Sequence, residues 1–484
     1  MIEDLVTGLS VPTDLWIGGQ WRSASDGGRF DVLDPATARP IASVANGTVE
    51  DALACVDAAE AAAPGWAATP PRQRGEILRR AFELMIEREH EIAELMVREN
   101  GKARNDALGE LRYAAEFFRW FSEEAVRITG EVRTAPAGTN QIMVIRQPIG
   151  IAFLITPWNF PAAMATRKMG PALAAGCTVL LKPASETPLT ALAIADLLRE
   201  AGVPDGVVNV LPSRRSGAVA DAVLADPRVR KLSFTGSTEV GRTLLRTASE
   251  QVISCSMELG GNAPLLVLDD ADLDVAVEGA LLAKMRNAGE ACTAANRMYV
   301  HRSVAEEFTR RLGEAMGALS VGPGVDDAAV GPLVNQSSLD KVDELVQDAI
   351  SQGATVVVGA SRGEGDGYFY APTVLAGVAP TSRILDEEIF GPVAPVVVFD
   401  TDEEAVRLAN RTEYGLVAYV FTSDLARGLR ISEALEAGMV GLNRGVVSDP
   451  AAPFGGVKQS GIGREGGHEG LLEYTESKYI AVQW

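Results

Sequence analysis

The feature that most constrains this chain is an alternation of short β-rich runs with helical segments that begins near residue 142. The first series comprises strand-like runs at Ile151–Ile155, Thr178–Leu181, Val207–Leu211 and Lys231–Phe234, and helical patterns at 187–201, 216–225 and 238–248. Such alternation predicts a parallel sheet with helices on both faces.

A second alternating series follows. Its strand-like runs are Leu265–Leu268, Met298–Val300, Val393–Phe399, Val417–Phe421 and Met439–Leu442, and its helical patterns lie near 272–287, 303–317, 337–352, 402–409 and 424–435. The simplest interpretation is an α/β protein with two doubly wound, Rossmann-like domains. We expect a cleft at their junction, near Glu258 to Gly261.

The remaining sequence fits a large protein with more than one core. The chain has 484 residues, too many for a single hydrophobic core. Residues 47–125 have the spacing of amphipathic helices, with Leu108, Leu111, Ala115 and Phe118 on one stripe. The segment from Leu471 to Trp484 is β-rich, which predicts a docked tail.

Composition narrows the function classes. The net charge of −21 and the lack of a Lys/Arg-rich run argue against nucleic acid and an anionic membrane as partners. The N-terminus lacks a signal-peptide pattern, so we expect a cytoplasmic protein. Four cysteines without a CxxC spacing and only three histidines favour neither a disulfide framework nor a metal site. Any general base is then expected to be a carboxylate.

Three loops after predicted strands carry polar side chains where ligands sit in α/β sheets. In Thr156–Pro161, the Asn159 amide can donate to a developing oxyanion, although a rigid turn packed by Trp158 explains the segment equally well. Lys182 and Ser185 can bind a ribose or phosphate, but a solvated lysine before a turn is the simpler explanation.

The third loop joins a strand to a helix. Gly236 lets the backbone approach a phosphate, and Ser237 lies at the helix N-terminus, which favours an anion. An ordinary capped helix is the alternative.

The one GxGxxG of the chain, Gly461–Gly466, neither follows a strand nor opens a convincing helix. We therefore expect a flexible loop near the site there and no dinucleotide motif.

Two residues are suited to covalent chemistry. Cys292 is surrounded by small residues that would leave its sulfur accessible, and a thiolate attacks carbonyls readily. A lone cysteine is more often a buried small hydrophobe, the expectation for Cys55, Cys177 and Cys255. Glu258 precedes a double glycine, and a partly buried carboxylate there can act as a general base; a surface glutamate is the alternative.

Together these segments resemble the aldehyde dehydrogenase superfamily over nearly the whole chain. Seven elements match in family order: Pro157–Pro161, Lys182–Pro188, Phe234–Gly241, Glu258–Pro264, Cys292, Glu387–Pro392 and Pro453–Lys458. The resemblance implies an NAD(P)-binding domain (1–127 and 147–258), a catalytic domain (259–455), and an oligomerisation flap with the C-terminal tail (128–146 and 456–484). It also implies a homodimer or homotetramer.

The resemblance further implies roles for single residues. Cys292 attacks the aldehyde, the Asn159 amide and the Cys292 backbone N–H hold the oxyanion, Glu258 activates water, and Glu465 assists proton transfer. The residues expected to contact the cofactor are Thr156, Trp158, Lys182, Ser185, Arg214, Gly236, Ser237, Leu259, Glu388 and Phe390.

Within the superfamily the sequence is most similar to succinate-semialdehyde dehydrogenases. The matching segments are Met164–Lys168, Lys284–Gly289 and Val447–Asp449. The likeness implies that Arg167, Arg286 and Ser448 bind the distal carboxylate of the substrate, which guanidinium groups recognise in bidentate fashion. One or both arginines can instead be surface ion-pair partners.

Several points stay open at this level. Arg214 or Arg215, together with Ser185, favours NADP over NAD. The position two residues after Cys292 is Ala294, so a disulfide switch found in some relatives is absent. Alternatives are glutarate semialdehyde, an aliphatic or aromatic aldehyde, a CoA-acylating enzyme, which Glu258 disfavours, and a non-catalytic NAD(P)-binding protein.

Overall fold

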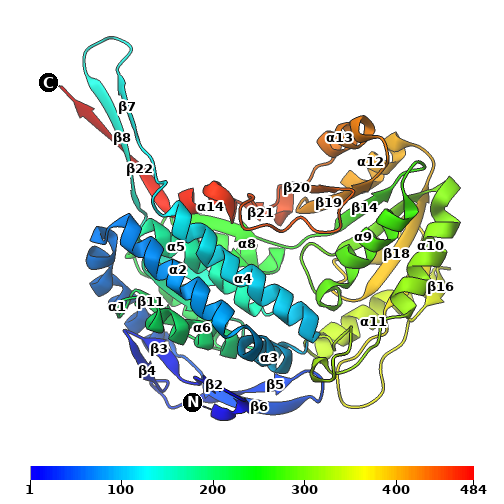
Figure 1. Ribbon diagram of the computed structural model, residues 1–484, viewed down its shortest axis with the longest axis horizontal. Helices are drawn as coiled ribbons and strands as arrows, with labels where there is room; N and C mark the ends of the chain where they lie inside the picture. Colours follow the sequence, from blue (N-terminus) through cyan, green and yellow to red (C-terminus); the bar gives the residue numbers. More distant parts are fainter. Residues whose placement is uncertain (1, 484) are drawn as a thin grey trace.

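A computed structural model of the protein describes residues 2–483. Two α/β domains lie side by side, and a narrow β arm projects from the first of them (Figure 1). The predicted α/β class with two doubly wound domains is confirmed.

The first domain is built on an eight-stranded sheet in the order β21-β13-β12-β9-β10-β11-β3-β4. Its five central strands are parallel, and the edge strands β3, β4 and β21 are antiparallel. The strands are β3 (Leu15–Ile17), β4 (Gln20–Arg22), β9 (Ile151–Ile155), β10 (Val179–Lys182), β11 (Val208–Val210), β12 (Val229–Thr235), β13 (Ser254–Glu258) and β21 (Gly461–Ile462). The associated helices are α5 (Pro161–Ala175), α6 (Pro188–Glu200), α7 (Ser216–Ala225), α8 (Thr238–Ser249) and α14 (Gly467–Leu472).

The second domain has a seven-stranded sheet in the order β16-β17-β18-β15-β14-β19-β20, parallel except for β16. Its strands are β14 (Ala263–Val267), β15 (Ala295–His301), β16 (Thr355–Val358), β17 (Thr373–Ala376), β18 (Val393–Phe399), β19 (Val417–Phe421) and β20 (Met439–Leu442). The helices are α9 (Leu273–Met285), α10 (Arg302–Gly317), α11 (Gln336–Ser351), α12 (Asp402–Asn410) and α13 (Leu425–Ala434), with 3-10 turns η1 (Arg286–Gly289), η2 (Gly324–Asp326), η3 (Arg383–Leu385) and η4 (Lys458–Ser460).

The helices expected over residues 47–125 are present and cover the first domain. They are α1 (Val49–Ala68), α2 (Pro71–Glu87), α3 (Glu89–Asn100) and α4 (Arg104–Glu124). Thr48 and Asp51 form a capping box at the start of α1, which satisfies backbone N–H groups that the helix leaves free. The apolar stripe of α4 packs against α2 and α5 in one continuous core.

The N-terminal strands escaped prediction. β1 (Ile2–Val6), β2 (Leu9–Val11), β5 (Arg29–Asp34) and β6 (Arg39–Ala45) form two small antiparallel pairs. β5, for example, buries alternate side chains, so it lacks the consecutive apolar run that marked buried strands such as β9. β13, β16 and β17 were also missed.

The arm consists of β7 (Glu131–Thr134), β8 (Gln141–Pro148) and β22 (Thr475–Val482), in the order β22-β8-β7. The expected docking of the tail therefore occurs by strand addition, while Trp484 lies outside the described residues. Residues 456–472 do not join the arm. β21 pairs with β13 in the first sheet, and α14 packs on α4 and α5. The GxGxxG segment is accordingly an ordered edge strand and turn, where a flexible loop was expected.

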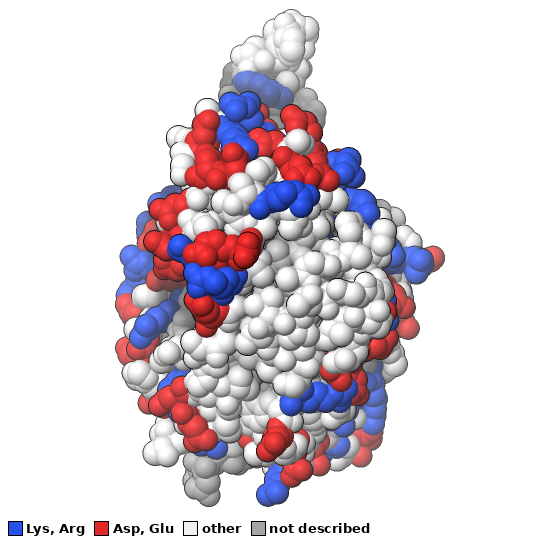
Figure 2. Space-filling view, turned by 90° about the vertical axis from the view of Figure 1, so that its right-hand side faces the viewer, with Lys and Arg blue, Asp and Glu red and all other residues white. Residues whose placement is uncertain are grey.

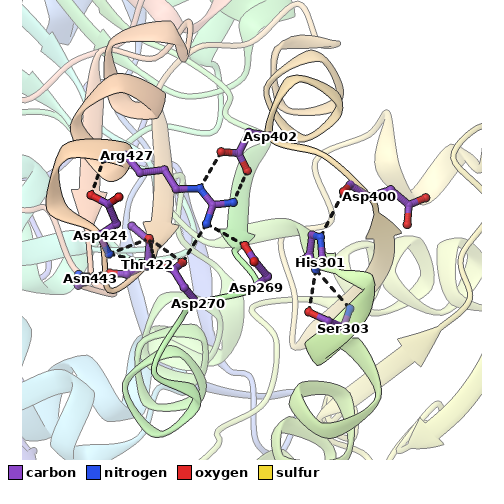
Figure 3. A network of polar contacts seen from close by, with 10 residues as sticks. All are labelled: Asp269, Asp270, His301, Ser303, Asp400, Asp402, Thr422, Asp424, Arg427 and Asn443. Atoms are coloured by element: carbon purple, nitrogen blue, oxygen red, sulfur yellow. Dashed lines mark hydrogen bonds and ion pairs between the residues drawn. The ribbon is translucent and has the colours of Figure 1, made fainter.

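A charged network ties three connections of the second domain together (Figure 3). Arg427 of α13 is paired with Asp269 at 2.7 Å and with both carboxylate oxygens of Asp402, at 2.7 and 2.5 Å. Asp270 adds a contact with Arg427 at 3.2 Å and accepts from Thr422. A bidentate arginine in a network holds geometry better than an isolated surface pair does.

The surface charge is unevenly spread. Figure 2 shows a broad face with few charged side chains on the side where α10 and β16 lie, with acidic and basic groups around it. None of the helices within residues 2–483 is long and apolar enough to cross a membrane.

Candidate functional site

The junction between the two sheets forms a cavity of about 240 Å³. β13 ends at Glu258 and β14 begins at Ala263, so the crossover segment lies at the carboxyl edge of the first sheet, as predicted. The lining residues come from both domains: Pro157, Trp158, Asn159, Met164, Thr235, Gly236, Ser237, Leu259, Gly260, Cys292, Ser338, Lys341, Glu388, Ile389 and Phe390. Eight of the predicted site residues therefore line this cavity: Trp158, Asn159, Gly236, Ser237, Leu259, Cys292, Glu388 and Phe390.

Cys292 lies in the cavity on a constrained loop. The three residues Asn287, Ala288 and Gly289 all have positive φ, at 55°, 53° and 78°. Such a run is rare for residues with a side chain and is held only where the surroundings enforce it. Cys292 is half-buried, less open than the sequence suggests. Burial raises the pKa of its thiol to about 12, although the charge of Arg167 opposes this rise.

The loop of Cys292 passes so close to position 261 that only glycine fits there. A Cβ atom at Gly261 would lie 2.5 Å from the Cys292 carbonyl oxygen, which is too close for any other residue. The double glycine after Glu258 thus lets the crossover pass directly against the segment that holds the sulfur.

Asn159 is fixed from several sides. Its Nδ2 donates to the Glu290 carbonyl at 3.0 Å, and its own carbonyl accepts from Lys102 Nζ at 2.8 Å and from Asn287 Nδ2 at 2.9 Å. Glu110 Oε2 lies 2.5 Å from Lys102 Nζ, and Glu110 also accepts from two backbone N–H groups at the start of α5. Lys102 and Asn287 therefore fix the backbone of Asn159, and the bond to Glu290 orients its side-chain amide, which leaves the second N–H of Nδ2 for a ligand in the cavity.

Glu258 lies behind the cavity and is not among the residues that line it. Its side chain is buried, and Oε2 has no hydrogen-bond partner among the described residues. Burial, reinforced by the charge of Glu465, raises the pKa of Glu258 well above its ordinary value. A buried carboxylate with a raised pKa beside a cysteine is the environment of a general base.

Glu465 is held by two buried cations. Arg167 Nε lies 2.5 Å from one carboxylate oxygen and Lys168 Nζ lies 2.5 Å from the other. Burial alone would raise the pKa of Glu465, but the charges of Lys168 and Arg167 outweigh it and hold the pKa below its ordinary value. Lys168 also donates to Ser233 at 2.9 Å.

The two predicted arginines differ in their partners. Arg167 is fully buried, paired with Glu465 and stacked on the Phe454 ring at 4.2 Å. Arg286 is only partly buried and lies over the Phe160 ring at 4.9 Å. Within residues 2–483 its guanidinium has no carboxylate partner. Asp106 is near enough for the charge of Arg286 to lower its pKa, although burial raises that pKa overall. Of the two arginines, Arg286 is therefore the one without a direct ion pair.

Among the described residues, no hydrogen bond joins Ser448 to Arg167 or Arg286. Its neighbours Val447 and Asp449 line a cavity of about 310 Å³ together with Phe454, on whose ring Arg167 stacks. The structure therefore places Ser448 on a loop close to the Arg167 side and not in the cavity of Cys292.

Two of the residues predicted for the far end of a cofactor, Ser185 and Arg214, line a second cavity of about 160 Å³. Val334 and Asn335 also line it, whereas Lys182 does not. Arg214 donates to the Asp31 carbonyl at 3.1 Å and stacks on the Phe30 ring at 5.0 Å. From the sequence, either Arg214 or Arg215 could favour NADP over NAD. Only Arg214 is among the described residues that line this cavity.

The remaining cofactor candidates lie near the strand ends between the two cavities. Arg215 is paired with Asp26 at 2.6 Å. Ser237 is the N-cap of α8, and Thr156 donates its backbone N–H to the Lys182 carbonyl. Burial lowers the pKa of Lys182 to about 8, so a bound anion would restore its full charge.

Glu388 and Phe390 lie across the first cavity from these loops. Phe390 meets Trp158 edge to face, with ring centroids 5.4 Å apart. Burial raises the pKa of Glu388 to about 7, and its Oε1 accepts from Gly261 N at 3.3 Å. Buried Lys284 donates to the Gly391 carbonyl at 3.2 Å and so braces the same loop.

Several residues of the site were not identified from sequence. They are Lys102, Glu110, Asn287 and Glu290 in the network around Asn159, and Ser338 and Lys341 on α11. A signal existed for Glu110, because it lies beside Leu111 on the apolar stripe of α4, where a charge needs a partner. Ser338 and Lys341 carry no such signal.

Comparison with known proteins gives consistent results. Residues 21–480 match the family model described as "Aldehyde dehydrogenase family". The chain is 56% identical over 443 residues to a succinate-semialdehyde dehydrogenase of Paenarthrobacter nicotinovorans, covering 91% of this chain and 98% of the relative. It is 46% identical over 468 residues to a glutarate-semialdehyde dehydrogenase of Pseudomonas putida, covering 96% and 97%. A solved structure of an NADP-dependent enzyme from E. coli superposes with a TM-score of 0.97 at 46% identity, covering 98% of each chain.

Proposed function

Since the chain belongs to the aldehyde dehydrogenase family, we propose that it oxidises succinic semialdehyde to succinate through a thioester on Cys292, with NADP⁺ or NAD⁺ as the acceptor. The observation that carries the substrate assignment is Arg286, whose guanidinium forms no salt bridge among the described residues and whose charge acts on Cys292. An aldehyde with a distal carboxylate supplies a direct partner for this guanidinium.

Cys292 forms the covalent bond. The thiol loses its proton and the sulfur adds to the aldehyde carbon, which places a negative charge on the former carbonyl oxygen. Asn159 holds that oxygen, because one N–H of its amide is committed to Glu290 and the other is free to donate. The backbone N–H of Cys292 is the second donor.

Loss of hydride from the carbon then leaves a thioester on Cys292, and water releases the acid. Glu258 is the base that takes the proton of this water, since burial gives its carboxylate a raised pKa. Glu465 does not touch the reacting atoms. It assists by holding Arg167 and Lys168 and by setting the charge around Glu258.

The two cavities fit an extended dinucleotide. Backbone N–H groups at the start of α8, with Gly236 and Ser237, suit the pyrophosphate, and Trp158 flanks it. Glu388, Phe390, Thr156 and Leu259 would hold the nicotinamide ribose end. When bound, the nicotinamide supplies the hydride acceptor.

The adenosine end falls to Lys182, Ser185 and Arg214. We favour NADP⁺, because Arg214 is the cationic side chain among the described residues that line the second cavity, beside the acids Asp31, Glu99 and Glu186, and it is prealigned by Phe30 and Asp31. A 2′-phosphate is recognised best by a guanidinium with free N–H groups. The NADP-dependent E. coli structure supports this choice.

The carboxylate anchor would consist of Arg286 and Arg167, with Ser448 on the neighbouring loop. Glutarate semialdehyde, one methylene longer, uses the same anchor, and the relative from Pseudomonas putida keeps it as the second candidate. Neutral aliphatic or aromatic aldehydes would leave Arg286 unpaired.

The test is the appearance of reduced cofactor at 340 nm, with succinic semialdehyde and either NADP⁺ or NAD⁺. Turnover that is lost in Cys292→Ala and retained in Cys255→Ala supports the proposal. Turnover of glutarate semialdehyde or hexanal, without turnover of succinic semialdehyde, would show that the substrate assignment is wrong. Cofactor binding without turnover of any aldehyde would indicate a non-catalytic protein of this fold.

We also propose a cytoplasmic homodimer or homotetramer assembled through the arm. Val132 is 62% exposed and Tyr479 58% exposed on this projecting sheet, which suits an interface better than solvent. Light scattering would measure the mass of the particle, and Tyr479→Lys together with Val132→Lys should reduce it toward 51.1 kDa. An unchanged mass would place the interface elsewhere.

A further inference from the structure

Glu290 is a buried acid that the proposed chemistry does not use. It lies two residues before Cys292 and is only 2% exposed. A glutamate is rarely buried to this extent unless its carboxylate is paired. The hydrogen bond that its carboxylate makes among the described residues comes from the backbone N–H of Val334, at 3.0 Å. Burial of a carboxylate that accepts a single hydrogen bond from a backbone N–H calls for an explanation in the structure.

The two ends of Glu290 reach different parts of the site. Its carbonyl accepts from Asn159 Nδ2 at 3.0 Å and from Asn287 Nδ2 at 3.1 Å. The backbone of Glu290 thus orients the amide that faces the substrate, while its side chain reaches the segment before α11.

That segment forms a wall of both cavities. Val334 and Asn335 line the second cavity, opposite Ser185 and Arg214. Asn335 caps α11, and Ser338 and Lys341 on its first turns line the first cavity with Cys292. A dinucleotide that spans both cavities therefore lies along residues 334–341 from end to end.

We propose that Glu290 is a positioning residue that couples this cofactor-facing wall, residues 334–341, to the loop of Cys292. A shift of the wall when the cleft fills is transmitted through the bond from Val334 to Glu290, and from there to Asn159 and the sulfur. The strained turn of Asn287 and Ala288 makes this loop one that can adopt a second arrangement. The inference rests on the proposed binding of NAD(P)⁺.

The experiment measures alkylation of Cys292 by iodoacetamide, followed by peptide mass spectrometry, with and without saturating NADP⁺. In the unaltered protein we expect the cofactor to change the rate at least about fivefold, the lower end of ordinary coupling between sites. In Glu290→Ala the change should shrink to less than about twofold. Glu290→Gln should keep it, because the amide oxygen accepts the same bond from Val334.

Glu124→Ala is the matched control. Glu124 is also a buried acid, but it is paired with Arg127 and His468 and lines neither of the two cavities. This variant should keep the cofactor-dependent change in alkylation. An equal loss in Glu124→Ala, or full coupling in Glu290→Ala, would overturn the proposal.

A measurement on the unaltered protein covers the case of a variant that does not fold. Hydrogen–deuterium exchange should slow together in residues 287–293 and 333–341 when NADP⁺ binds. Protection of the second segment alone would refute the coupling. Trp158 fluorescence reports cofactor binding separately, so absence of binding counts against the proposed function, whereas binding without coupling counts only against Glu290.

Discussion

Arg167 and Glu465 form a buried ion pair in which Nε lies 2.5 Å from Oε2. Lys168 occupies the other oxygen of the same carboxylate. Two cations and one anion are thus packed behind Glu258, whose own side chain has no cationic partner within hydrogen-bonding distance in the described chain. The charge of Glu465 is therefore one of the main influences on the protonation of Glu258.

Replacing Glu465 by Gln should shift the pH–rate profile. The Glu465 charge raises the pKa of Glu258, and Arg167 and Lys168 lower it. Removing the one anion leaves both cations, so the pKa of Glu258 falls. The rising limb of kcat for succinic semialdehyde should then move to lower pH. Glu473→Gln, which removes the partner of buried Lys231, is the control and should leave the limb in place. A shift to higher pH would contradict the assignment of Glu258.

Arg286→Met should weaken binding of the distal carboxylate without unfolding the protein. Charged hydrogen bonds contribute about 1.5–3 kcal/mol, which corresponds to a roughly 10- to 150-fold rise in KM for succinic semialdehyde. The kcat/KM for butanal should stay nearly constant, since butanal has no carboxylate. An equal loss with both aldehydes would mean that Arg286 acts on Cys292 and not on the substrate.

Arg167→Met should instead lower stability as well as activity. It leaves Glu465 with Lys168 as its only cation, and loss of one partner from a buried pair costs about 3 kcal/mol or more. The midpoint of thermal unfolding should fall in Arg167→Met and stay within a degree or two in Arg286→Met. Equal midpoints in the two variants would show that the Arg167–Glu465 pair contributes little.

Arg214→Ser should change the choice of cofactor. Loss of the one cation that lines the second cavity within residues 2–483 should raise KM for NADP⁺ by roughly 10-fold or more and leave KM for NAD⁺ nearly unaltered. Arg215→Ser is the matched control, because Arg215 is paired with Asp26 away from the cavity. Parallel changes for both cofactors would place the 2′-phosphate elsewhere or exclude it.

The sequence allowed β9, β10, β11 and β12 of the first sheet and β14, β15, β18, β19 and β20 of the second to be located, because their β-rich runs alternate with helical segments. It did not reveal β3 and β4, which lie outside that alternation and join the first sheet from the N-terminus by antiparallel pairing. Likewise β21 is recruited from a glycine-rich turn by pairing with β13, a contact between residues about 200 positions apart. Such pairing is decided by tertiary structure and not by local propensity.

At the site, motifs identified the residues that face the cavity but not those that hold them. Asn159 and Cys292 lie in recognisable segments, whereas Lys102 and Glu290 act through backbone carbonyls and N–H groups, which any sequence possesses. The pairing of Arg167 with Glu465 was not predictable for a similar reason. Both residues were singled out, yet only the folded geometry shows that they pair with each other while Arg286 forms no salt bridge among the described residues.

Glu290 also gives the protein a pH-dependent stability of defined sign. Burial raises its pKa from 4.5 to about 8, so the folded state binds this proton more tightly than the unfolded chain does. The contribution to stability is complete below about pH 4.5 and is lost as the pH rises through 8.

Glu290→Gln has no proton to lose, so its unfolding midpoint should rise relative to that of the unaltered protein between pH 5 and 9. Glu99 and Glu388 titrate with the same sign in both proteins and cancel in the difference. Differential scanning fluorimetry at pH 5, 7 and 9 measures this difference, and a constant value would mean that Glu290 is already ionised in the folded protein, stabilised by Lys102 and the Val334 N–H.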